Sequence, residues 1–311
     1  MKKRILTVGE ARIDLCMPIS ELPRSPKAPV IAKSCSFVPS GSGAIAATAV
    51  ARLGGDSVLC TRIGRDRNGT DLRKIYEYEK IDTRFVAADA ALPTSFSVIY
   101  ASESSARQID LAPDATSALS PDDVEGAFIC RPDAMLISTE LPHATVVAAV
   151  ELARKRDVPV YLDGGASVGS FPFDELPPIE LFAPDEDETK LLTDISPDTP
   201  EKCLKAAIAL SRIVRARFYA IKLGNRGCYI YDGKYYHCLP AYDVKLKDCT
   251  AAGDAFVAAL TLEHLNSGDI ARAGKVANAV GALTVNRKGA LISVPHRKDV
   301  ADFIAERAIR L

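Results

Sequence analysis

The 311-residue sequence has no excess of charge of either sign. It holds 39 Lys and Arg residues against 40 Asp and Glu residues, which gives a formal net charge of −1 at pH 7. Binding to the phosphate backbone of a nucleic acid needs a surplus of positive charge. We therefore expect no nucleic-acid partner.

Long apolar runs are missing as well. No stretch approaches the roughly 20 residues that a helix needs to span a bilayer, so we expect no membrane-spanning segment and no membrane partner. The first ten residues, MKKRILTVGE, have a basic start but only a short apolar run before Gly9. They predict a β-strand over 5–8 and not the apolar core of a signal peptide.

The eight cysteines form no C-x-x-C pair, and the four histidines lie far apart along the chain. Disulfide frameworks are typical of small secreted chains, and a metal site needs ligands at close spacing. Because neither pattern is present, we interpret the cysteines as reduced thiols, mostly packed as small hydrophobic side chains. We expect a cytoplasmic protein.

Strand-like and helical segments alternate along nearly the whole chain. A strand–helix–strand pattern over 134–138, 144–156 and 158–162 implies a parallel sheet. Asp232-Gly233 is the strongest hairpin signal, between strands over 228–231 and 234–238. The other expected elements are strands over 58–63 and 218–223, and helices over 44–53, 70–80, 200–215, 252–265, 270–285 and 297–309. The pattern predicts a doubly wound α/β body.

Two segments interrupt this alternation. Five prolines between Leu15 and Pro39 exclude a helical period there, and 95–102 and 106–111 have the pattern of two strands joined by the polar residues 103–105. We expect these segments to form a small β-sheet, a lid over the carboxyl ends of the body strands, where open α/β sheets bind ligands. The expected division is a lid of 11–40 and 94–112, and a body of 1–10, 41–93 and 113–311.

The lid also predicts a homodimer. A small sheet with bare edges and an apolar face favours association with another copy.

The stretch Gly41–Ala46 fits the dinucleotide fingerprint G-x-G-x-x-A. That fingerprint needs a strand leading directly into the turn and an acidic residue about 20 positions later. Here Pro39-Ser40 precede the glycines, and the next strand ends at 61–64 without an acidic residue. We therefore disfavour a nicotinamide-dependent dehydrogenase and expect only a close approach of the backbone to a ligand.

A second stretch of small residues, KDCTAAGDAF at 247–256, opens the helix expected over 252–265. The N–H groups of Ala252, Gly253 and Asp254 would point out of its first turn and, with the helix dipole, favour an anion. Asp254 could accept the proton of a bound hydroxyl, while Asp248 could hold the loop or a cation. An ordinary N-cap carboxylate would give the same pattern, so the residues alone leave both roles open.

KDCTAAGDAF resembles the signature of the ribokinase-like sugar kinases of the PfkB family, and five further motifs follow that family's order. They are Gly9-Glu10 with Asp14, PSGSGAIAATAVARLGG at 39–55, GRDRNG at 64–69, KLGNRG at 222–227, and VNRKGA at 285–290 with Pro295. The resemblance implies a ribokinase-like three-layer α/β/α doubly wound sheet with a small β-sheet lid. It also implies a kinase that uses ATP, Mg²⁺ and K⁺ to phosphorylate a hydroxyl of a small carbohydrate, ribose-, fructose- or keto-deoxy-sugar-like.

The resemblance further implies roles for individual residues. Asp254 matches the base that accepts the proton of the sugar hydroxyl, and the amides of Ala252, Gly253 and Asp254, next to Ala251, match an anion hole. The implied binding positions are Asp14, Gly41, Ser42, Ile45 and Glu140 for the acceptor; Lys222, Gly224, Gly227, Asn278, Asp185 and Glu188 for the nucleotide and its metal; and Asp248, Thr250, Gly289 and Ser293 for the monovalent cation.

Three positions depart from the family pattern. Ile45 stands where the family has an Asn that contacts the sugar, which predicts a less polar acceptor pocket. Ser40 replaces a glycine, which would stiffen a hinge, and Asp185 replaces an Asn, which adds negative charge near the metal and phosphates. Two alternatives stay open: a nucleoside kinase of the same fold, and a catalytically weak regulator that binds a sugar or nucleotide.

Overall fold

The structure is a computed structural model that describes residues 2–20, 29–101 and 106–311. Within these residues, nine strands form one sheet in the order β13-β12-β11-β10-β9-β8-β1-β4-β5. Neighbours from β11 to β5 pair in parallel, and β12 and β13 add an antiparallel edge. The strands are β1 (Arg4–Val8), β4 (Asp56–Gly64), β5 (Val86–Asp89), β8 (Ala134–Ser138), β9 (Val160–Asp163), β10 (Ile179–Ala183), β11 (Ala216–Lys222), β12 (Cys228–Tyr231) and β13 (Tyr236–Leu239).

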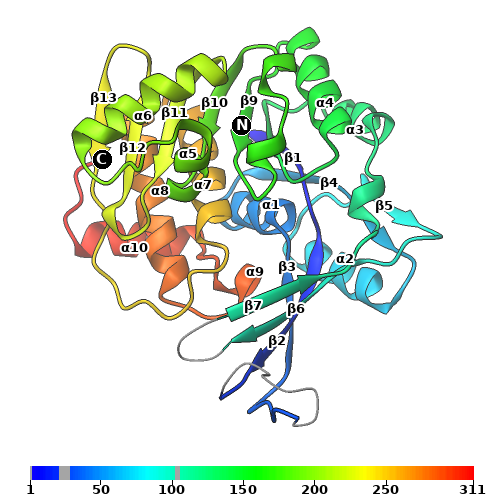
Figure 1. The fold of residues 1–311 in the computed structure, drawn as a ribbon. Helices are drawn as coiled ribbons and strands as arrows, with labels where there is room; N and C mark the ends of the chain where they lie inside the picture. Colours follow the sequence, from blue (N-terminus) through cyan, green and yellow to red (C-terminus); the bar gives the residue numbers. More distant parts are fainter. Residues whose placement is uncertain (1, 21–28, 102–105) are drawn as a thin grey trace.

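Helices cover both faces of this sheet, which confirms the predicted three-layer fold (Figure 1). Side chains alternate between the faces of a strand, and in β1 Ile5 belongs to one core while Leu6 and Val8 belong to the other. The first core packs against α1 (Ser42–Arg52), α2 (Arg67–Tyr78), α7 (Ala252–Ser267), α8 (Ile270–Val285), α9 (Ala290–Ser293) and α10 (Arg297–Glu306). The second packs against α3 (Pro121–Ala127), α4 (His143–Lys155), α5 (Glu186–Thr193) and α6 (Pro200–Ile213).

Several observed elements are not among the expected ones. β5 and β10 are strands of four and five residues, too short to show a period. α3 is a seven-residue helix that begins with Ser120 as N-cap and a proline in its first turn. In the described part of the chain, no helix combines the length and apolar character needed to cross a membrane.

The eight cysteines are unpaired, but only four of them are buried. Cys35, Cys238 and Cys249 are exposed, so the expectation that the thiols are mostly packed inside holds for half of them.

The predicted small sheet is present and projects from one end of the body (Figure 1). Its order is β3-β2-β6-β7, with β2 and β6 parallel and both outer pairs antiparallel. The expected hairpin tip at 103–105 lies outside the described residues. The strands are β2 (Arg12–Pro18), β3 (Ser36–Ser40), β6 (Ser95–Ala101) and β7 (Ala106–Asp110).

The expectation of no strand directly before the glycines of the dinucleotide fingerprint is wrong. A strand, β3, does lead directly to Gly41, contrary to expectation. It pairs antiparallel with β2 in the small sheet, so this strand–turn–helix unit is no part of the parallel sheet on which a dinucleotide site is built.

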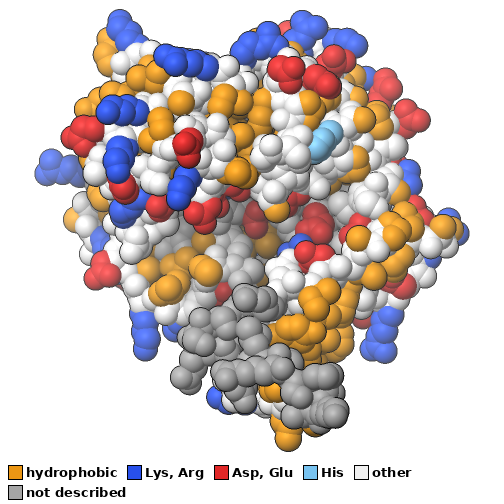
Figure 2. All heavy atoms as spheres, in the orientation of Figure 1, with side chains coloured by type: hydrophobic (Ala, Val, Ile, Leu, Met, Phe, Trp, Pro, Cys, Tyr) orange, Lys and Arg blue, Asp and Glu red, His pale blue; other side chains and the backbone are white. Residues whose placement is uncertain are grey.

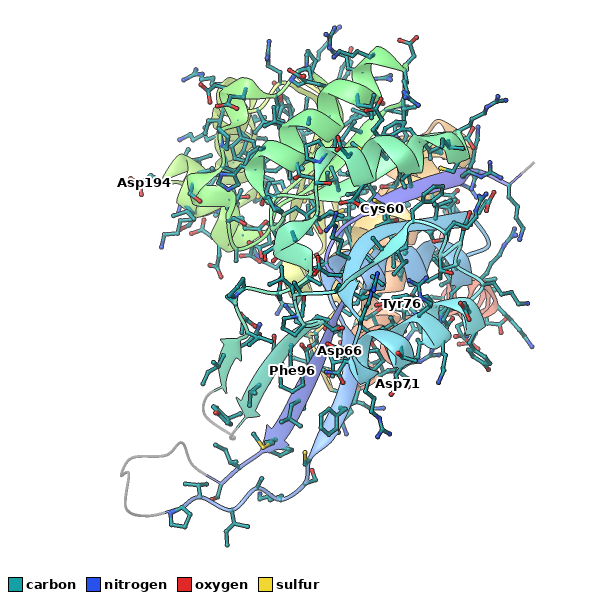
Figure 3. All side chains as sticks on the ribbon, turned by 90° about the vertical axis from the view of Figure 1, so that its right-hand side faces the viewer. Cys60, Asp66, Asp71, Tyr76, Phe96 and Asp194 are labelled. Atoms are coloured by element: carbon teal, nitrogen blue, oxygen red, sulfur yellow. The ribbon has the colours of Figure 1, made fainter. Side chains whose placement is uncertain are left out.

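Asp66 joins the small sheet to the body (Figure 3). Its Oδ1 accepts hydrogen bonds from the Gly69 N–H at 2.8 Å and from the Thr94 hydroxyl at 2.7 Å, and its Oδ2 accepts one from the Thr94 N–H at 2.7 Å. Although burial opposes it, these bonds lower the pKa of Asp66. The carboxylate therefore fixes the start of β6 to the N-terminus of α2.

Two glycines bring the start of α1 against the end of β1. A Cβ on Gly43 would lie 2.5 Å from the Gly9 Cα, and the Ala44 N–H donates to the Glu10 carbonyl at 3.0 Å. The backbones touch, so neither position has room for a side chain.

We predict that Gly43→Ala lowers the free energy of unfolding by about 1–3 kcal/mol, the usual cost of overpacking. Gly281→Ala is the matched control, because Gly281 lies inside α8 and a Cβ there meets no atom within 4 Å. That variant should be more stable than the wild type by about 0.5–1 kcal/mol. Urea denaturation measures both; equal stability of the two variants would show that the glycine contact has no such role.

Candidate active site

The carboxyl ends of β1, β8 and β9 meet the first turns of α1 and α7 around a small hollow. Asp and Glu side chains gather in the cleft between the body and the small sheet (Figure 2). The hollow is lined by Thr7, Val8, Ser42, Gly43, Ala46, Leu136, Ile137, Ser138, Asp163 and Asp254.

The first turn of α7 presents two free amides. Ala251 is the N-cap and has a left-handed backbone, with φ of 68°. The Ala252 N–H points to the Cys249 carbonyl at 3.4 Å, whereas the N–H groups of Gly253 and Asp254 have no acceptor among the described residues. The expected three-amide anion hole is thus reduced to two free donors and one that is weakly engaged.

Asp254 is a half-buried carboxylate surrounded by other charges. Its pKa is raised to about 7, because burial, Asp163 and Glu140 together raise it more than Lys222 and Arg12 lower it. Within the described chain, no group donates a hydrogen bond to the Asp254 side chain. A carboxyl group with this pKa can accept and release a proton near neutral pH.

Lys222 and Asp163 form an ion pair beside the α7 N-terminus. Lys222 Nζ lies 2.5 Å from Asp163 Oδ1, and the two side chains are 14% and 13% exposed. Nζ would also lie 3.6 Å from a Cβ on Gly253. Although burial opposes it, Asp163 and Glu188 raise the pKa of Lys222 above its ordinary value, so the ammonium group stays charged next to the free amides.

Asp185 and Glu188 cap helix α5. Asp185 Oδ1 accepts the Glu188 N–H at 2.8 Å, and Glu188 accepts the N–H groups of Asp185 at 2.7 Å and Gly165 at 2.6 Å. Burial raises the pKa of Glu188. The described bonds are structural, and the implied contact with a nucleotide or metal stays a prediction.

Arg12 lies between two carboxylates, one of which is the expected acceptor residue Asp14. Arg12 Nη1 lies 2.8 Å from Glu10 Oε2, and its Nε lies 2.7 Å from Asp14 Oδ1. Asp14 is almost fully buried, and burial raises the pKa of Glu10 to about 7. Arg12 therefore fixes the orientation of both carboxylates.

Other expected acceptor residues differ in their placement. Gly41, with φ of 99°, begins α1, and a Cβ there would lie 2.6 Å from the Glu10 carbonyl. Glu140 is exposed beside Gly165 and raises the pKa of both Glu10 and Asp254. Ile45 is buried in the core and is not among the residues that line the hollow, and its expected place in the acceptor pocket stays a prediction.

Two of the expected nucleotide residues, Gly227 and Asn278, contact the same segment at 239–240. Gly224 and Gly227 both have positive φ in the turn after β11, and a Cβ on Gly227 would lie 2.1 Å from the Leu239 carbonyl. Asn278 donates from Nδ2 to the carbonyls of Leu239 at 3.0 Å and Pro240 at 3.1 Å. These contacts fix the turn after β11 against residues 239–240. The role of these residues in nucleotide binding stays a prediction.

Asp248 joins the two loops expected at the cation site. Its Oδ1 accepts the Thr250 N–H at 3.0 Å, and its Oδ2 accepts the Gly289 N–H at 3.1 Å. Ser293 lies at the end of α9, where its hydroxyl donates to the Ala290 carbonyl at 2.6 Å. Asp248, Thr250 and Gly289 are thus brought together, and a carboxylate with backbone oxygens suits a hard cation.

No three His, Cys, Asp or Glu side chains of the described residues converge in a way that could hold a metal ion.

Arg12, Asp163 and Thr7 were not singled out from the sequence. Asp163 had a usable signal, because it directly follows the strand predicted over 158–162 and so stands at the ligand-binding edge. No motif or spacing in the sequence pointed to Arg12 or to Thr7.

Comparison with known proteins shows the relatives of the chain. The sequence model of the pfkB family carbohydrate kinases matches residues 2–297. A ribokinase of Haemophilus influenzae is 27% identical over 306 residues, covering 98% of this chain and 99% of its own. An ATP-dependent ribose-1-phosphate kinase of Halopiger xanaduensis is 28% identical over 312 residues, again covering 98% and 99%. The structure of Arabidopsis thaliana ribokinase complexed with ribose and ATP shares the fold, with a TM-score of 0.86 at 23% identity and coverage of 98% and 99%.

We predict that Asp254 titrates near pH 7 and responds in opposite directions to its two charged neighbours. Asp163→Asn removes a negative charge and should lower the pKa of Asp254, whereas Lys222→Met removes a positive charge and should raise it. The carboxyl carbon chemical shift of Asp254, followed against pH in protein with unchanged circular dichroism, measures both. Shifts of the same sign in the two variants would contradict the charge arrangement.

Proposed function

The chain belongs to the pfkB family of carbohydrate kinases, and from this premise we propose that it transfers the γ-phosphoryl group of ATP to a hydroxyl of a small carbohydrate. The observation that carries the proposal is the position of Asp254, a carboxylate with a pKa of about 7 in the first turn of α7. It lies beside two free amides and the ammonium group of Lys222.

In this proposal Asp254 acts as the general base. It accepts the proton of the acceptor hydroxyl while the oxygen of that hydroxyl forms a bond to the γ-phosphorus and the bond from that phosphorus to the ADP oxygen breaks. The N–H groups of Gly253 and Asp254, together with Lys222 Nζ, stabilise the negative charge on the transferring group. Lys222 is held in place for this task by Asp163.

On the acceptor side, Asp14 and Glu140 would accept hydrogen bonds from sugar hydroxyls, and Arg12 would hold Asp14 in its binding orientation. Gly41 and Ser42 let the acceptor approach the start of α1. We retain the carbohydrate as the acceptor because the matching family is that of the carbohydrate kinases. The nucleoside alternative, which drew its support from Ile45, is an outcome of the screen below.

We assign the nucleotide to the side of the cleft formed by Lys222, Gly224, Gly227 and Asn278. Mg²⁺ would neutralise charge on the phosphates when bound, with Asp185 and Glu188 as the nearby carboxylates. We place K⁺ at Asp248, Thr250, Gly289 and Ser293, where Asp248 already links the two loops.

We also propose that the small sheet is a lid of 11–40 and 94–112 on a body of 1–10, 41–93 and 113–311. The row Val38, Asp14, Ser97 and Asp110 across its strands has three polar members and belongs to the face with Arg12. The neighbouring row, on the other face, is Phe37, Leu15, Val98 and Ile109, in which Phe37 is 64% and Ile109 is 56% exposed. An exposed apolar face of this kind fits a homodimer formed through the lid.

The test of function is an ADP-release screen over pentoses, hexoses, keto-deoxy sugar acids and nucleosides, with K⁺ or with Na⁺. We expect activity with a carbohydrate, dependence on K⁺, and a loss of about 10²–10⁴-fold in Asp254→Asn, the usual contribution of a general base. Asp302→Asn, an exposed acid on α10, is the control and should keep wild-type activity.

The other outcomes each reject part of the proposal. Activity on nucleosides alone would establish the nucleoside kinase. ATP binding without ADP release on any acceptor would favour the regulator. Activity of Asp254→Asn within a few-fold of the wild type would remove Asp254 from the role of base.

The dimer is tested by sedimentation at micromolar concentration. We expect the wild type to be a dimer and the double variant Phe37→Asp with Ile109→Asp to be a monomer, because charge on the apolar row opposes its burial. Tyr78→Asp is the control, since Tyr78 is an aromatic residue on α2 that is 84% exposed. A monomeric wild type, or dissociation by the control substitution as well, would contradict an interface at the lid.

A further inference from the structure

The cavity beside Asp254, the hollow described above, leaves about 10 Å³ for the centre of a water molecule, which is room for one molecule. One buried water needs between two and four polar partners. The polar side chains around the cavity are Thr7 of β1, Ser42 of α1, Ser138 of β8, Asp163 of β9 and Asp254 of α7. The cavity thus has the size and the polarity for one water molecule.

Two hydroxyl groups at this cavity lack partners. Thr7 is 1% exposed, and its Oγ1 makes no hydrogen bond within the described residues. Side chains two positions apart share a face of a strand, so Thr7 points to the side of Ile5, toward α1 and α7. Ser42 Oγ is buried there too, and it also has no partner in the described chain. A buried hydroxyl without a partner is costly, and ordered water is the usual remedy.

The two carboxylates at the cavity have acceptor capacity left. Asp163 uses Oδ1 for both of its described bonds, from Lys222 Nζ at 2.5 Å and from the Gly164 N–H at 3.0 Å. Its Oδ2 accepts no bond from any residue that the structure describes, and neither does the carboxylate of Asp254.

We infer that Thr7 and Ser42 hold one water molecule that donates hydrogen bonds to Asp254 and to Asp163 Oδ2. The water accepts the two hydroxyl protons and donates its own two protons, which gives it four bonds and satisfies all four side chains. Thr7 is then a positioning residue for the base. The inference rests on the proposed function only in so far as Asp254 is that base.

Such a water would favour the ionised form of Asp254. A hydrogen bond donated to a carboxylate lowers its pKa, and so opposes the effect of burial. The charged groups that face Asp254 from the surrounding elements are Asp163 and Glu140, which raise its pKa, and Lys222 and Arg12, which lower it. All four stay in place when only the Thr7 hydroxyl is removed.

Thr7→Val tests the inference, because valine keeps the shape of threonine without the hydroxyl. We expect the acid limb of kcat/KM to move to higher pH by about half to one unit, the shift that corresponds to one ordinary hydrogen bond. Below the limb, activity should fall about three- to tenfold, and at high pH it should equal that of the wild type. Thr7→Ser retains the hydroxyl and should restore the wild-type profile.

Thr61→Val is the matched control. Thr61 is a fully buried threonine of β4 whose hydroxyl also lacks a partner in the described chain, but it does not line the cavity. The pH profile of kcat/KM in Thr61→Val should match that of the wild type. An unmoved acid limb in Thr7→Val, or an equal shift in Thr61→Val, would overturn the inference.

A readout without activity separates this inference from the proposed function. The carboxyl carbon titration of Asp254 in the protein without substrate should show the same shift in Thr7→Val, and a crystal structure should show the water in the wild type and not in this variant. If Asp254→Asn keeps its activity, the proposed function fails while the titration still tests the water. If Asp254→Asn is inactive and the titration of Thr7→Val matches that of the wild type, only the water is wrong.

Discussion

The contact between the backbones of Gly9 and Gly43 is the constraint on which the rest of the site depends. A Cβ on either residue would lie 2.5 Å from the backbone of the other. Because glycine has no Cβ, the start of α1 can pack directly against the end of β1. This placement brings Ser42 beside Thr7 and turns the first turn of α1 toward the first turn of α7. The two helix N-termini then converge on the edge of the sheet where the strands end, which favours anionic groups.

The cleft carries an excess of negative charge, although the whole chain is nearly neutral. Carboxylates outnumber cations there, and the two cations, Arg12 and Lys222, are each bound to one or two acids. Burial and this surplus of acids bring the pKa of Asp254 to about 7. A polyanionic ligand would therefore depend on the α7 amides and the Lys222 ammonium group, which the overall charge of a sequence does not reveal.

The sequence predicted what short motifs and periodicity encode. The parallel sheet, the small sheet and the helix start that carries Asp254 follow from local patterns, and the structure has each of them. Asp163 and Lys222 are 59 residues apart, and their pairing depends on which strands become neighbours. Ile45 is predicted at the acceptor pocket from its position in a binding motif alone, and its side chain is buried in the core.

The small sheet also constrains how the chain can fold. β2 and β6 pair in parallel, Arg12 with Ser95 through Pro18 with Ala101, and a parallel pair cannot close by a tight turn. During synthesis β2 therefore emerges well before its partner, and its contacts must wait until α1, β4 and α2 have been made. Such long-range pairing slows folding, and until it is complete Leu15 lacks the neighbouring strand that carries Val98. The nascent chain is then most exposed to aggregation, before any ligand can bind.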